Sequence, residues 1–334
     1  MTVCVINAAV VGLGWWGDKV VRDLAGSDDI RIVAGVDVRE EARTAALAWV
    51  DEVYSDFEAV LRDESIDAVI LCTPHRFHTD QIVAAAAHGK HVFCEKPLST
   101  SGEEARRAVA AVTSAGVQLG IGHERRFEPA VAALRRSIAD GELGVPMIFE
   151  GNFSQDKFLD LPAENWRLSA VEAPVGPLSA TGIHLVDLAI SILGRPVEVW
   201  ARLSTQATTF ANGDTLAITL AFEKGQTALI TAVLATPFVG RVTVLGSEGW
   251  VEIRDRTHPE APEGWDVTRQ MRGHSATSEF FPPHASVREN IESFARAAAG
   301  QAPYPVPLDE MVANACAFEA ITRSAHSGAV ELVR

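Results

Sequence analysis

A glycine-rich turn near the N-terminus constrains the fold of this chain more than any other stretch. The turn follows an apolar run over 3–11 and precedes a helical pattern over 18–25. With this spacing, the first glycine permits a tight turn, the second lets a pyrophosphate approach the backbone, and the third lets the helix pack on the strand. The helix start attracts phosphate. The stretch therefore predicts a dinucleotide-binding turn, whose expected cofactor contacts are Gly12, Leu13, Gly14, Trp15, Trp16 and Gly17.

The second β-rich run, over 30–36, ends at Asp37. A carboxylate about 20 residues after the glycines, at the tip of the second strand, is placed to accept hydrogen bonds from a ribose. It would also repel a 2′-phosphate, so the expected cofactor is NAD and NADP is the less favoured one. Arg39 could weaken this preference by pairing with a phosphate. The alternative role for Asp37 is to cap a helix that begins near Glu40.

Length and composition indicate a globular protein of two domains. The chain has 334 residues, of which 47% are hydrophobic and 22% charged, so its sequence is too long for one ordinary core and unlike a disordered one. The formal net charge is −15 and no basic stripe is present. This charge pattern excludes nucleic acid and anionic membrane surfaces as expected partners.

The cysteines are too far apart for a disulfide framework or a metal site: Cys4, Cys72, Cys94 and Cys316. We expect buried thiols and no bound metal. The N-terminal stretch lacks the basic region of a signal peptide, and no apolar run approaches the length of a membrane span. These features predict a cytoplasmic protein.

Strands and helices alternate through the first third of the chain, which predicts parallel βαβ units. Expected strands cover 67–72, 89–94 and 117–121, and expected helices cover 40–49, 56–62, 80–88 and 103–115. Polar residues follow two of these strands, at the sheet edge where ligands bind in open α/β sheets. We expect cofactor contacts there from Thr73, Pro74, His75, His78, Glu95 and Lys96. The alternative for Lys96 is a solvated surface lysine.

These and further segments resemble the Gfo/Idh/MocA family of NAD(P)-dependent oxidoreductases over nearly the whole chain. The Glu-Lys-Pro segment after Gly-Lys-His-Val is the most specific of them. The matching segments are Gly12-Leu-Gly-Trp-Trp-Gly17, Cys72-Thr-Pro-His75 with His78, Gly89-Lys-His-Val92, Glu95-Lys-Pro97, Gly122-His-Glu-Arg-Arg-Phe127 with Pro129, Gly141-Glu-Leu-Gly144, Asn165-Trp-Arg167, and Gly182-Ile-His184 with Asp187.

The expected architecture is an N-terminal Rossmann domain (1–122), a doubly wound parallel sheet, followed by an α+β domain (123–334) with a large, mainly antiparallel sheet. Over 215–222 large and small residues alternate with a period of two, as in a strand with one buried face. Further strands are expected over 147–153, 197–204, 226–234 and 241–245, a loop over 258–283, and closing helices over 287–299 and 308–327. These helices could pack back on the first domain. The resemblance implies a homodimer or homotetramer that pairs through the open sheet face.

The expected catalytic residues are Lys96 and His184. A histidine beside an apolar helix face is by itself more often structural, but the resemblance implies that His184 faces the nicotinamide. Its imidazole could take the hydroxyl proton, while Lys96 could polarise the oxygen or act as the base. Asp187, three residues on, could orient the imidazole, bind a substrate hydroxyl or serve as a solvated cap.

One position departs from the family pattern. Many members carry an aspartate four residues before the histidine, where this chain has Ala180. Alanine cannot relay a proton or bind a hydroxyl, although Ser179, Thr181 or Asp187 could partly substitute. The departure weakens the case for a standard polyol-dehydrogenase mechanism but leaves the hydride-transfer residues in place.

The remaining candidates are expected to contact substrate or cofactor. Arg125 and Arg126 could bind cofactor or a substrate carboxylate, or form ordinary surface pairs, and Trp166 could stack on a sugar or belong to the core. Arg125 is included with the cofactor contacts; the expected substrate contacts are Glu124, Asn152, Trp166, Arg167, Thr181 and Asp187.

The sequence thus predicts an NAD(P)-dependent dehydrogenase or reductase that acts on CH–OH groups of a sugar, polyol or cyclic diol. Two alternatives remain: a lyase or glycosidase that oxidises its substrate transiently with a retained NAD, and a non-catalytic protein that senses NAD or a metabolite. Ala180 favours the sensor, whereas the presence of both Lys96 and His184 favours an enzyme.

Overall fold

The computed structural model describes residues 5–334, so Cys4 and the first residues of the strand expected over 3–11 lie outside the described residues. The chain divides into two compact units. Unit 1 comprises the described residues up to Glu124 together with Val287–Val312, and unit 2 comprises Arg125–Ser286 together with Ala313–Arg334.

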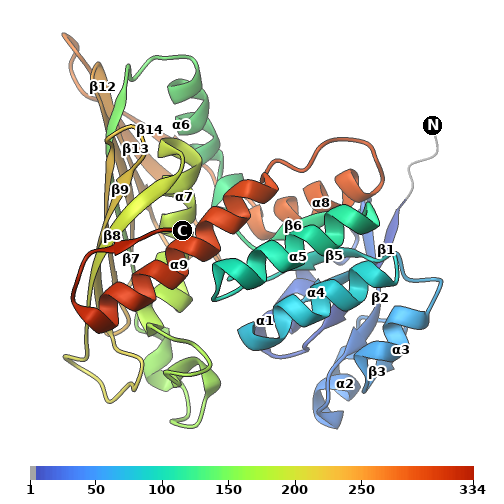
Figure 1. Ribbon diagram of the computed structural model, residues 1–334. Helices are drawn as coiled ribbons and strands as arrows, with labels where there is room; N and C mark the ends of the chain where they lie inside the picture. Colours follow the sequence, from blue (N-terminus) through green and yellow to red (C-terminus); the bar gives the residue numbers. More distant parts are fainter. Residues whose placement is uncertain (1–4) are drawn as a thin grey trace. The chain divides into compact units, whose positions relative to one another are not determined.

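Within its described residues, unit 1 contains a six-stranded parallel sheet in the order β3-β2-β1-β4-β5-β6 (Figure 1). The strands are β1 (Ile6–Val11), β2 (Ile30–Val36), β3 (Glu52–Tyr54), β4 (Ala68–Leu71), β5 (His91–Cys94) and β6 (Leu119–Ile121). The helices between them are α1 (Trp15–Asp23), α2 (Glu40–Ala46), α3 (Phe57–Arg62), α4 (His78–Ala87) and α5 (Gly102–Ala115). The predicted Rossmann arrangement is confirmed.

Burial on both faces explains why the central strands read as continuous apolar runs. Every residue of β4 is fully buried, as expected for a parallel strand covered by helices on both sides. One covering helix comes from far along the sequence: α8 (Ser286–Ala298) places Ile291 and Phe294 in the core of unit 1. The Phe294 ring meets Phe93 of β5 edge to face, with ring centroids 5.6 Å apart.

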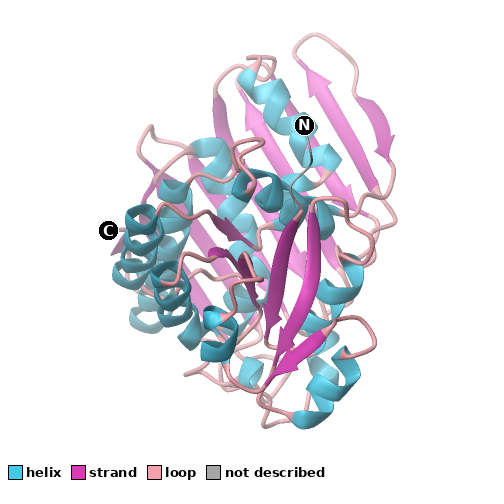
Figure 2. Cartoon of the chain, turned by 90° about the vertical axis from the view of Figure 1, so that its right-hand side faces the viewer, coloured by secondary structure: helices cyan, strands magenta, loops and turns pink. Residues whose placement is uncertain are grey.

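Unit 2, which is described throughout, is built on a nine-stranded sheet in the order β14-β13-β12-β11-β7-β10-β9-β8-β15 (Figure 2). Only β7 and β10 pair in parallel, so the sheet is mixed and mainly antiparallel, as predicted. Its first strands are β7 (Pro146–Ser154), β8 (Pro196–Ser204), β9 (Thr215–Phe222), β10 (Thr227–Val233) and β11 (Val239–Gly246). The others are β12 (Gly249–Asp255), β13 (Trp265–Met271), β14 (Thr277–Phe281) and β15 (Glu331–Leu332).

Helices cover one face of this sheet (Figure 1). The alternation predicted for β9 is present, with Leu216, Ile218, Leu220 and Phe222 buried. These side chains share one core with α6 (Pro129–Ala139), α7 (Ile183–Leu193) and the later turns of α9 (Leu308–Ser327). The opposite face of β9 is only partly buried.

The prediction of a loop over 258–283 is wrong, because β13 and β14 form an antiparallel hairpin there. Only Trp265 and Val267 of β13 reach the core, and β14 is almost fully exposed. These strands lie at the edge of the sheet, where polar side chains on both faces conceal the period-two signal.

The loop between β8 and β9, residues 205–213, is held by Asp214. This carboxylate is fully buried and accepts hydrogen bonds from the backbone N–H groups of Gln206, Ala207 and Thr208, and from the hydroxyls of Thr208 and Thr215. Burial alone would raise the pKa of Asp214, but these hydrogen bonds lower it from an ordinary 3.8 to about 2.

Because the folded pKa is lowered, Asp214 stabilises the fold fully above its unfolded pKa, and this stabilisation disappears as the pH falls towards about 2. The shift corresponds to about 2 kcal/mol. We expect Asp214→Asn to lower the free energy of unfolding by this order at pH 6, and the difference from wild type to shrink below pH 4, as measured by urea titration. A difference that stays constant between pH 6 and pH 3 would contradict this assignment.

Candidate active site

The three glycines of the turn between β1 and α1 have different roles: at two of them the backbone lies against other backbone atoms, and at the third no protein atom is near. Gly12 has a φ of +92°, and a Cβ there would lie 2.8 Å from the carbonyl oxygen of Cys72. A Cβ on Gly17 would lie 1.9 Å from the carbonyl oxygen of Gly12. A Cβ on Gly14 would have no protein atom within 4 Å. The structure thus leaves room for a ligand at Gly14, as a cofactor cradle requires.

Helix α1 begins at Trp15, three residues earlier than expected from the sequence. Its N-cap is Gly14, and no side chain caps the first turn. Backbone N–H groups at such a terminus, together with the positive end of the helix dipole, suit phosphate oxygens. The Trp15 side chain is exposed, whereas Trp16 is half-buried and packs against the core of unit 1.

Asp37 fastens the end of β2 to the glycine turn. Its carboxylate accepts a hydrogen bond from the backbone N–H of Leu13 at 2.9 Å, and others from the backbone and guanidinium of Arg39. Burial raises the pKa of Asp37, but the hydrogen bonds from Arg39 and Leu13 outweigh it, so the pKa lies below its ordinary value. The N-cap of α2 is Arg39, and Asp37 therefore does not cap that helix.

The Arg39 guanidinium lies against Asp37 in this structure, with 3.0 Å between its Nη2 and the Asp37 Oδ2. More than half of the Arg39 side chain remains exposed. It occupies the carboxylate oxygens that a ribose hydroxyl would approach, so a ribose contact requires the guanidinium to turn outward and give up its hydrogen bonds to Asp37.

Two loops meet where β4 and β5 end. The Thr73 hydroxyl donates to Gln81 of α4, and His75 begins a short 3₁₀ turn. The fully buried His78 ring lies between two carbonyl oxygens, those of Pro97 at 2.8 Å and Thr73 at 2.9 Å. Burial lowers the pKa of His78. Both ring nitrogens thus face backbone, so His78 joins the two loops and does not present a nitrogen to a cofactor.

Lys96 follows β5 between two buried residues. The carboxylate of Glu95 lies against the Cα of Gly122, where a Cβ would come within 2.5 Å of it. It also accepts a hydrogen bond from the backbone N–H of Lys96 at 3.2 Å. The Lys96 side chain is half-buried, and its peptide bond to Pro97 is cis. Lys96 is therefore anchored through its backbone, unlike a freely solvated lysine.

In unit 2, His184 lies in the first turn of α7, directly after a π-helical turn over Leu178–Gly182. Turns of this kind are frequent at functional sites because the extra residue re-aims the side chains around it. Ala180 belongs to this turn and is partly exposed. The His184 side chain is 4% exposed, and its ring centroid lies 6.1 Å from that of Phe153.

An aromatic cluster around Phe153 was missed in the sequence. The Phe153 ring contacts those of Phe238 and His258, with centroids 6.1 and 5.5 Å away, and the Arg125 guanidinium lies 5.2 Å from its centroid. Gln155 follows on the same strand end, is 5% exposed, and has a side-chain oxygen with no hydrogen-bond donor within the described residues. The signal that could have revealed these residues is the mixture of aromatic and amide side chains at the end of a strand.

Three predicted ligand contacts are instead buried and bonded to protein. Asp187 forms a two-point ion pair with Arg126, at 2.7 and 2.6 Å. Arg125 pairs with Glu128 and, at 2.7 and 2.8 Å, with Asp255. The Thr181 hydroxyl donates to the carbonyl of Phe153 at 2.8 Å. These groups hold α6, α7, β7 and β12 together, and we do not carry Arg125, Thr181 or Asp187 forward as ligand contacts.

Asn152 is not brought to His184. Its neighbours Gly151 and Phe153 face α7, and a Cβ on Gly151 would meet Leu185. Asn152 alternates with them and therefore faces the other side of the sheet, where it accepts a hydrogen bond from Ser154. Glu124 is buried in a 3₁₀ turn. Trp166 and Arg167 lie in another such turn, with the guanidinium 4.4 Å from the indole centroid.

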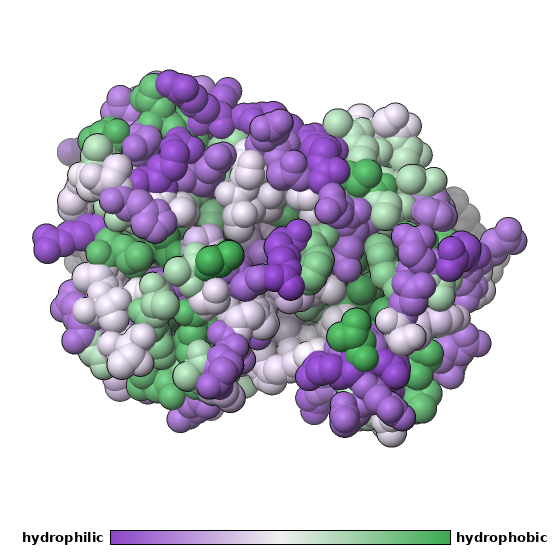
Figure 3. Space-filling model, turned by 60° about the horizontal axis from the view of Figure 1, so that its bottom comes forward, coloured by the Kyte–Doolittle hydropathy of each residue, from purple (hydrophilic) through white to green (hydrophobic). Residues whose placement is uncertain are grey.

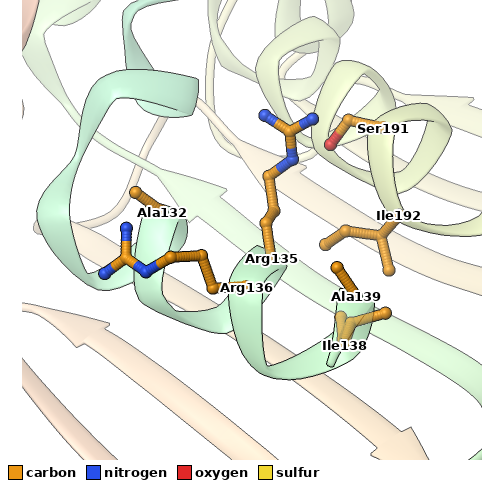
Figure 4. A pocket seen from close by; sticks show the side chains of 7 residues that line it. All are labelled: Ala132, Arg135, Arg136, Ile138, Ala139, Ser191 and Ile192. Carbon is orange, nitrogen blue, oxygen red and sulfur yellow. The ribbon is translucent and has the colours of Figure 1, made fainter. Parts of the chain in front are cut away.

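A cavity of about 450 Å³ between α6 and α7 contains none of the predicted site residues (Figure 4). Its lining is Ala132, Arg135, Arg136, Ile138, Ala139, Ser191 and Ile192. On the face drawn in Figure 3, apolar groups form separate patches among hydrophilic residues.

Within residues 5–334, no helix combines the length and apolar character needed to cross a bilayer. The same residues contain no group of three or more His, Cys, Asp or Glu arranged for a metal ion.

The contrast between two glycines tests the cofactor cradle. Gly14→Ala should leave the melting temperature unchanged, because its Cβ meets no protein atom, yet weaken NAD binding by at least about tenfold by filling the space beside the backbone. Gly17→Ala, the matched control, should instead destabilise the fold because its Cβ collides with the Gly12 carbonyl. Calorimetry measures the NAD affinity of each variant, and thermal unfolding measures its melting temperature. Unchanged NAD affinity in Gly14→Ala would refute the cradle.

Comparison with known proteins agrees with this geometry. Residues 6–123 match the family model described as "Oxidoreductase family, NAD-binding Rossmann fold", and residues 131–252 match the "GFO/IDH/MocA C-terminal domain".

D-xylose 1-dehydrogenase (NADP(+)) 2 of Haloferax volcanii is 32% identical over 307 residues, which cover 90% of this chain and 91% of that protein. scyllo-Inositol 2-dehydrogenase (NAD(+)) of Bacillus subtilis is 32% identical over 267 residues, or 76% and 75% of the two chains. The solved structure of levoglucosan dehydrogenase in complex with NADH shares the fold, with a TM-score of 0.87 at 21% identity, covering 99% of this chain and 100% of that one.

The two family matches together span most of the chain, and the glycine turn, Asp37 and the parallel sheet all lie within the first of them. The chain therefore belongs to the GFO/IDH/MocA family of oxidoreductases, and unit 1 carries that family's NAD-binding Rossmann domain.

Proposed function

We propose that the protein is an NAD(P)-dependent oxidoreductase that transfers a hydride between the nicotinamide and a secondary alcohol or ketone of a sugar, polyol or cyclic diol. The observation that carries this proposal is the open space at Gly14 before an uncapped helix start, in a chain whose relatives are named as xylose and inositol dehydrogenases. These names favour a dehydrogenase over a transient-oxidation lyase, glycosidase or sensor.

The residues of unit 1 fit a dinucleotide. The turn from Gly12 to Gly17 would hold the pyrophosphate at the start of α1, and Asp37 would accept hydrogen bonds from the ribose after Arg39 turns away. Thr73, Pro74, His75 and Glu95 stay in the proposed set because they lie where β4 and β5 end. When bound, NAD accepts or returns the hydride.

Lys96 and His184 would supply the proton chemistry. The Lys96 ammonium would stabilise negative charge that develops on the substrate oxygen, while the backbone N–H of Lys96 is held by the Glu95 carboxylate. The His184 imidazole, in a largely water-free environment beside Phe153, would take the hydroxyl proton during oxidation and return it during reduction.

Substrate contacts would come from Trp166, Arg167 and Gln155. The indole face of Trp166 suits C–H groups of a sugar ring, and Arg167 and Gln155 suit its hydroxyls. The unsatisfied, buried oxygen of Gln155 is costly by itself and would be satisfied by a substrate hydroxyl. Gln155 thereby offers a polar contact that Ala180 cannot supply. Glu124 stays a prediction.

We further propose a homodimer or homotetramer formed through the open face of the nine-stranded sheet. Trp200, Thr219 and Leu229 lie side by side on this face in the register of β8, β9 and β10. Trp200 and Leu229 are 39% and 44% exposed, which is high for large apolar side chains in the middle of a sheet. The cytoplasmic location stays a prediction.

Cofactor preference tests the role of Asp37. Asp37→Asn keeps an oxygen for the Leu13 N–H but removes the charge that repels a 2′-phosphate, so the ratio of kcat/KM for NADP to that for NAD should rise roughly tenfold. Steady-state kinetics with both cofactors measures this ratio, and Glu40→Gln, an exposed acid nearby, is the matched control. An unchanged ratio would argue against a ribose contact.

The role of Lys96 is tested by Lys96→Ala. Turnover should fall at least about a hundredfold, because one positioned electrostatic donor contributes on the order of 3–4 kcal/mol to a transition state. NAD affinity should stay within about threefold of wild type, since the backbone contact to Glu95 is kept. Stopped-flow kinetics and calorimetry measure both, with the exposed Lys224→Ala as control. Wild-type turnover in Lys96→Ala would exclude Lys96 from catalysis.

A further inference from the structure

The loop over 205–213, between β8 and β9, braces a segment that lies about forty residues earlier in the chain. That segment, 165–177, carries Trp166 and Arg167 and leads into the π-helical turn before His184. The buried carboxylate of Asp214 fixes the loop by accepting hydrogen bonds from three of its backbone N–H groups. The loop therefore has a defined shape and presents one residue, Asn212, to the segment.

Asn212 is 2% exposed and contacts the segment at three points. Its side-chain Nδ2 donates one hydrogen bond to the carbonyl of Arg167 and one to that of Ala173, each at 2.8 Å. Its backbone carbonyl accepts a hydrogen bond from the N–H of Gly176 at 2.7 Å. Because both side-chain partners are carbonyls, only the NH₂ group of the amide can face them.

The segment depends on this contact because it has little regular structure of its own. Beyond the short turn over Trp166–Leu168, residues 169–175 form turns and bends and no regular helix or strand. Val175 has a φ of +51°, a conformation that a β-branched residue adopts only when its surroundings impose it. Next to it, a Cβ on Gly176 would come within 2.8 Å of the Asn212 amide, so the segment and the loop are in close contact there.

We propose that Asn212 is a positioning residue that sets the orientation of Arg167, and with it Trp166, for substrate binding. This inference rests on the proposed function, in which both residues contact the substrate. The side chain of Asn212 bonds the part of the segment that carries Arg167, whereas its backbone bonds Gly176 next to the π-helical turn. Truncating the side chain therefore releases the Arg167 end and keeps the His184 end anchored.

This division predicts a split between KM and kcat. In Asn212→Ala two backbone carbonyls lose their donors, and KM for the substrate should rise about tenfold. kcat should stay within about twofold, because the hydrogen bond from the Gly176 N–H goes to the backbone carbonyl of residue 212, which alanine also has. Asn212→Asp keeps the shape but removes the donors, so it should raise KM at least as much. Thr205→Ala, which removes a bond inside the same exposed loop, is the matched control and should leave KM unchanged.

A double-mutant cycle with Arg167→Ala separates positioning from general support of the fold. If Asn212 acts through Arg167, the rise in KM caused by Asn212→Ala should shrink below about twofold when Arg167 is already alanine. Melting temperatures are measured for every variant. Should both Asn212 variants fail to fold, Gly176→Ala displaces the Asn212 amide and should raise KM in the same way.

Three results would overturn the inference: additive effects in the cycle, a wild-type KM in Asn212→Asp, or a fall in kcat without a rise in KM. These differ from failure of the proposed function. If Arg167→Ala alone leaves KM at its wild-type value, Arg167 does not contact the substrate, and the proposed site itself is wrong. If Arg167→Ala raises KM but the cycle is additive, only the role of Asn212 is wrong.

Discussion

The close approach of Gly17 to the carbonyl of Gly12 is the contact on which the first half of the molecule depends. A single Cβ at Gly17 would lie 1.9 Å from that oxygen, so helix α1 can start directly after β1 only with glycine there. The Asp37 carboxylate then secures the turn by accepting the N–H of Leu13. Together these contacts hold the start of α1 open at Gly14, which is the physical basis for binding a dinucleotide.

Buried charges have a comparable role in unit 2. The pairs Arg126–Asp187 and Arg125–Asp255 are only 1–2% exposed, and they join α7 and β12 to the turn that precedes α6. Burying such pairs costs desolvation, so their net contribution to stability is small, but breaking one leaves an uncompensated charge. We infer that they fix the position of α7, which carries His184, more than they stabilise the fold.

The sequence was sufficient for features whose signal is local. The glycine spacing predicted the turn, and the alternation of Leu216, Ile218 and Leu220 predicted β9 with its buried face. It failed where the deciding partner is remote. Asp187 pairs with a residue 61 positions away and Arg125 with one 130 positions away, so neither partner could be read from spacing. The β13–β14 hairpin was missed because edge strands with polar faces lack the alternating pattern.

The same limit applies to the candidate site. Lys96 and His184 could be predicted as candidates because they lie in short recognisable segments, and the structure adds how the backbone at each is placed, by Glu95 and by the π-helical turn. Gln155 and Asn212 were not predicted: the amide of Gln155 could be suspected only from its place beside aromatic residues at a strand end, and the role proposed for Asn212 depends on carbonyl groups about forty residues away in the sequence.

Net, NAD(P)-linked oxidation of a sugar or polyol is the activity that distinguishes a dehydrogenase from the alternatives. The most direct test is NADH absorbance during incubation of the purified wild-type protein with NAD and single members of a panel of aldoses, inositols and anhydrosugars. Our account predicts that at least one member gives continuous, stoichiometric formation of NADH. Binding of NAD with no net NADH from any member, and no oxidation of NADH by the corresponding ketones, would contradict it.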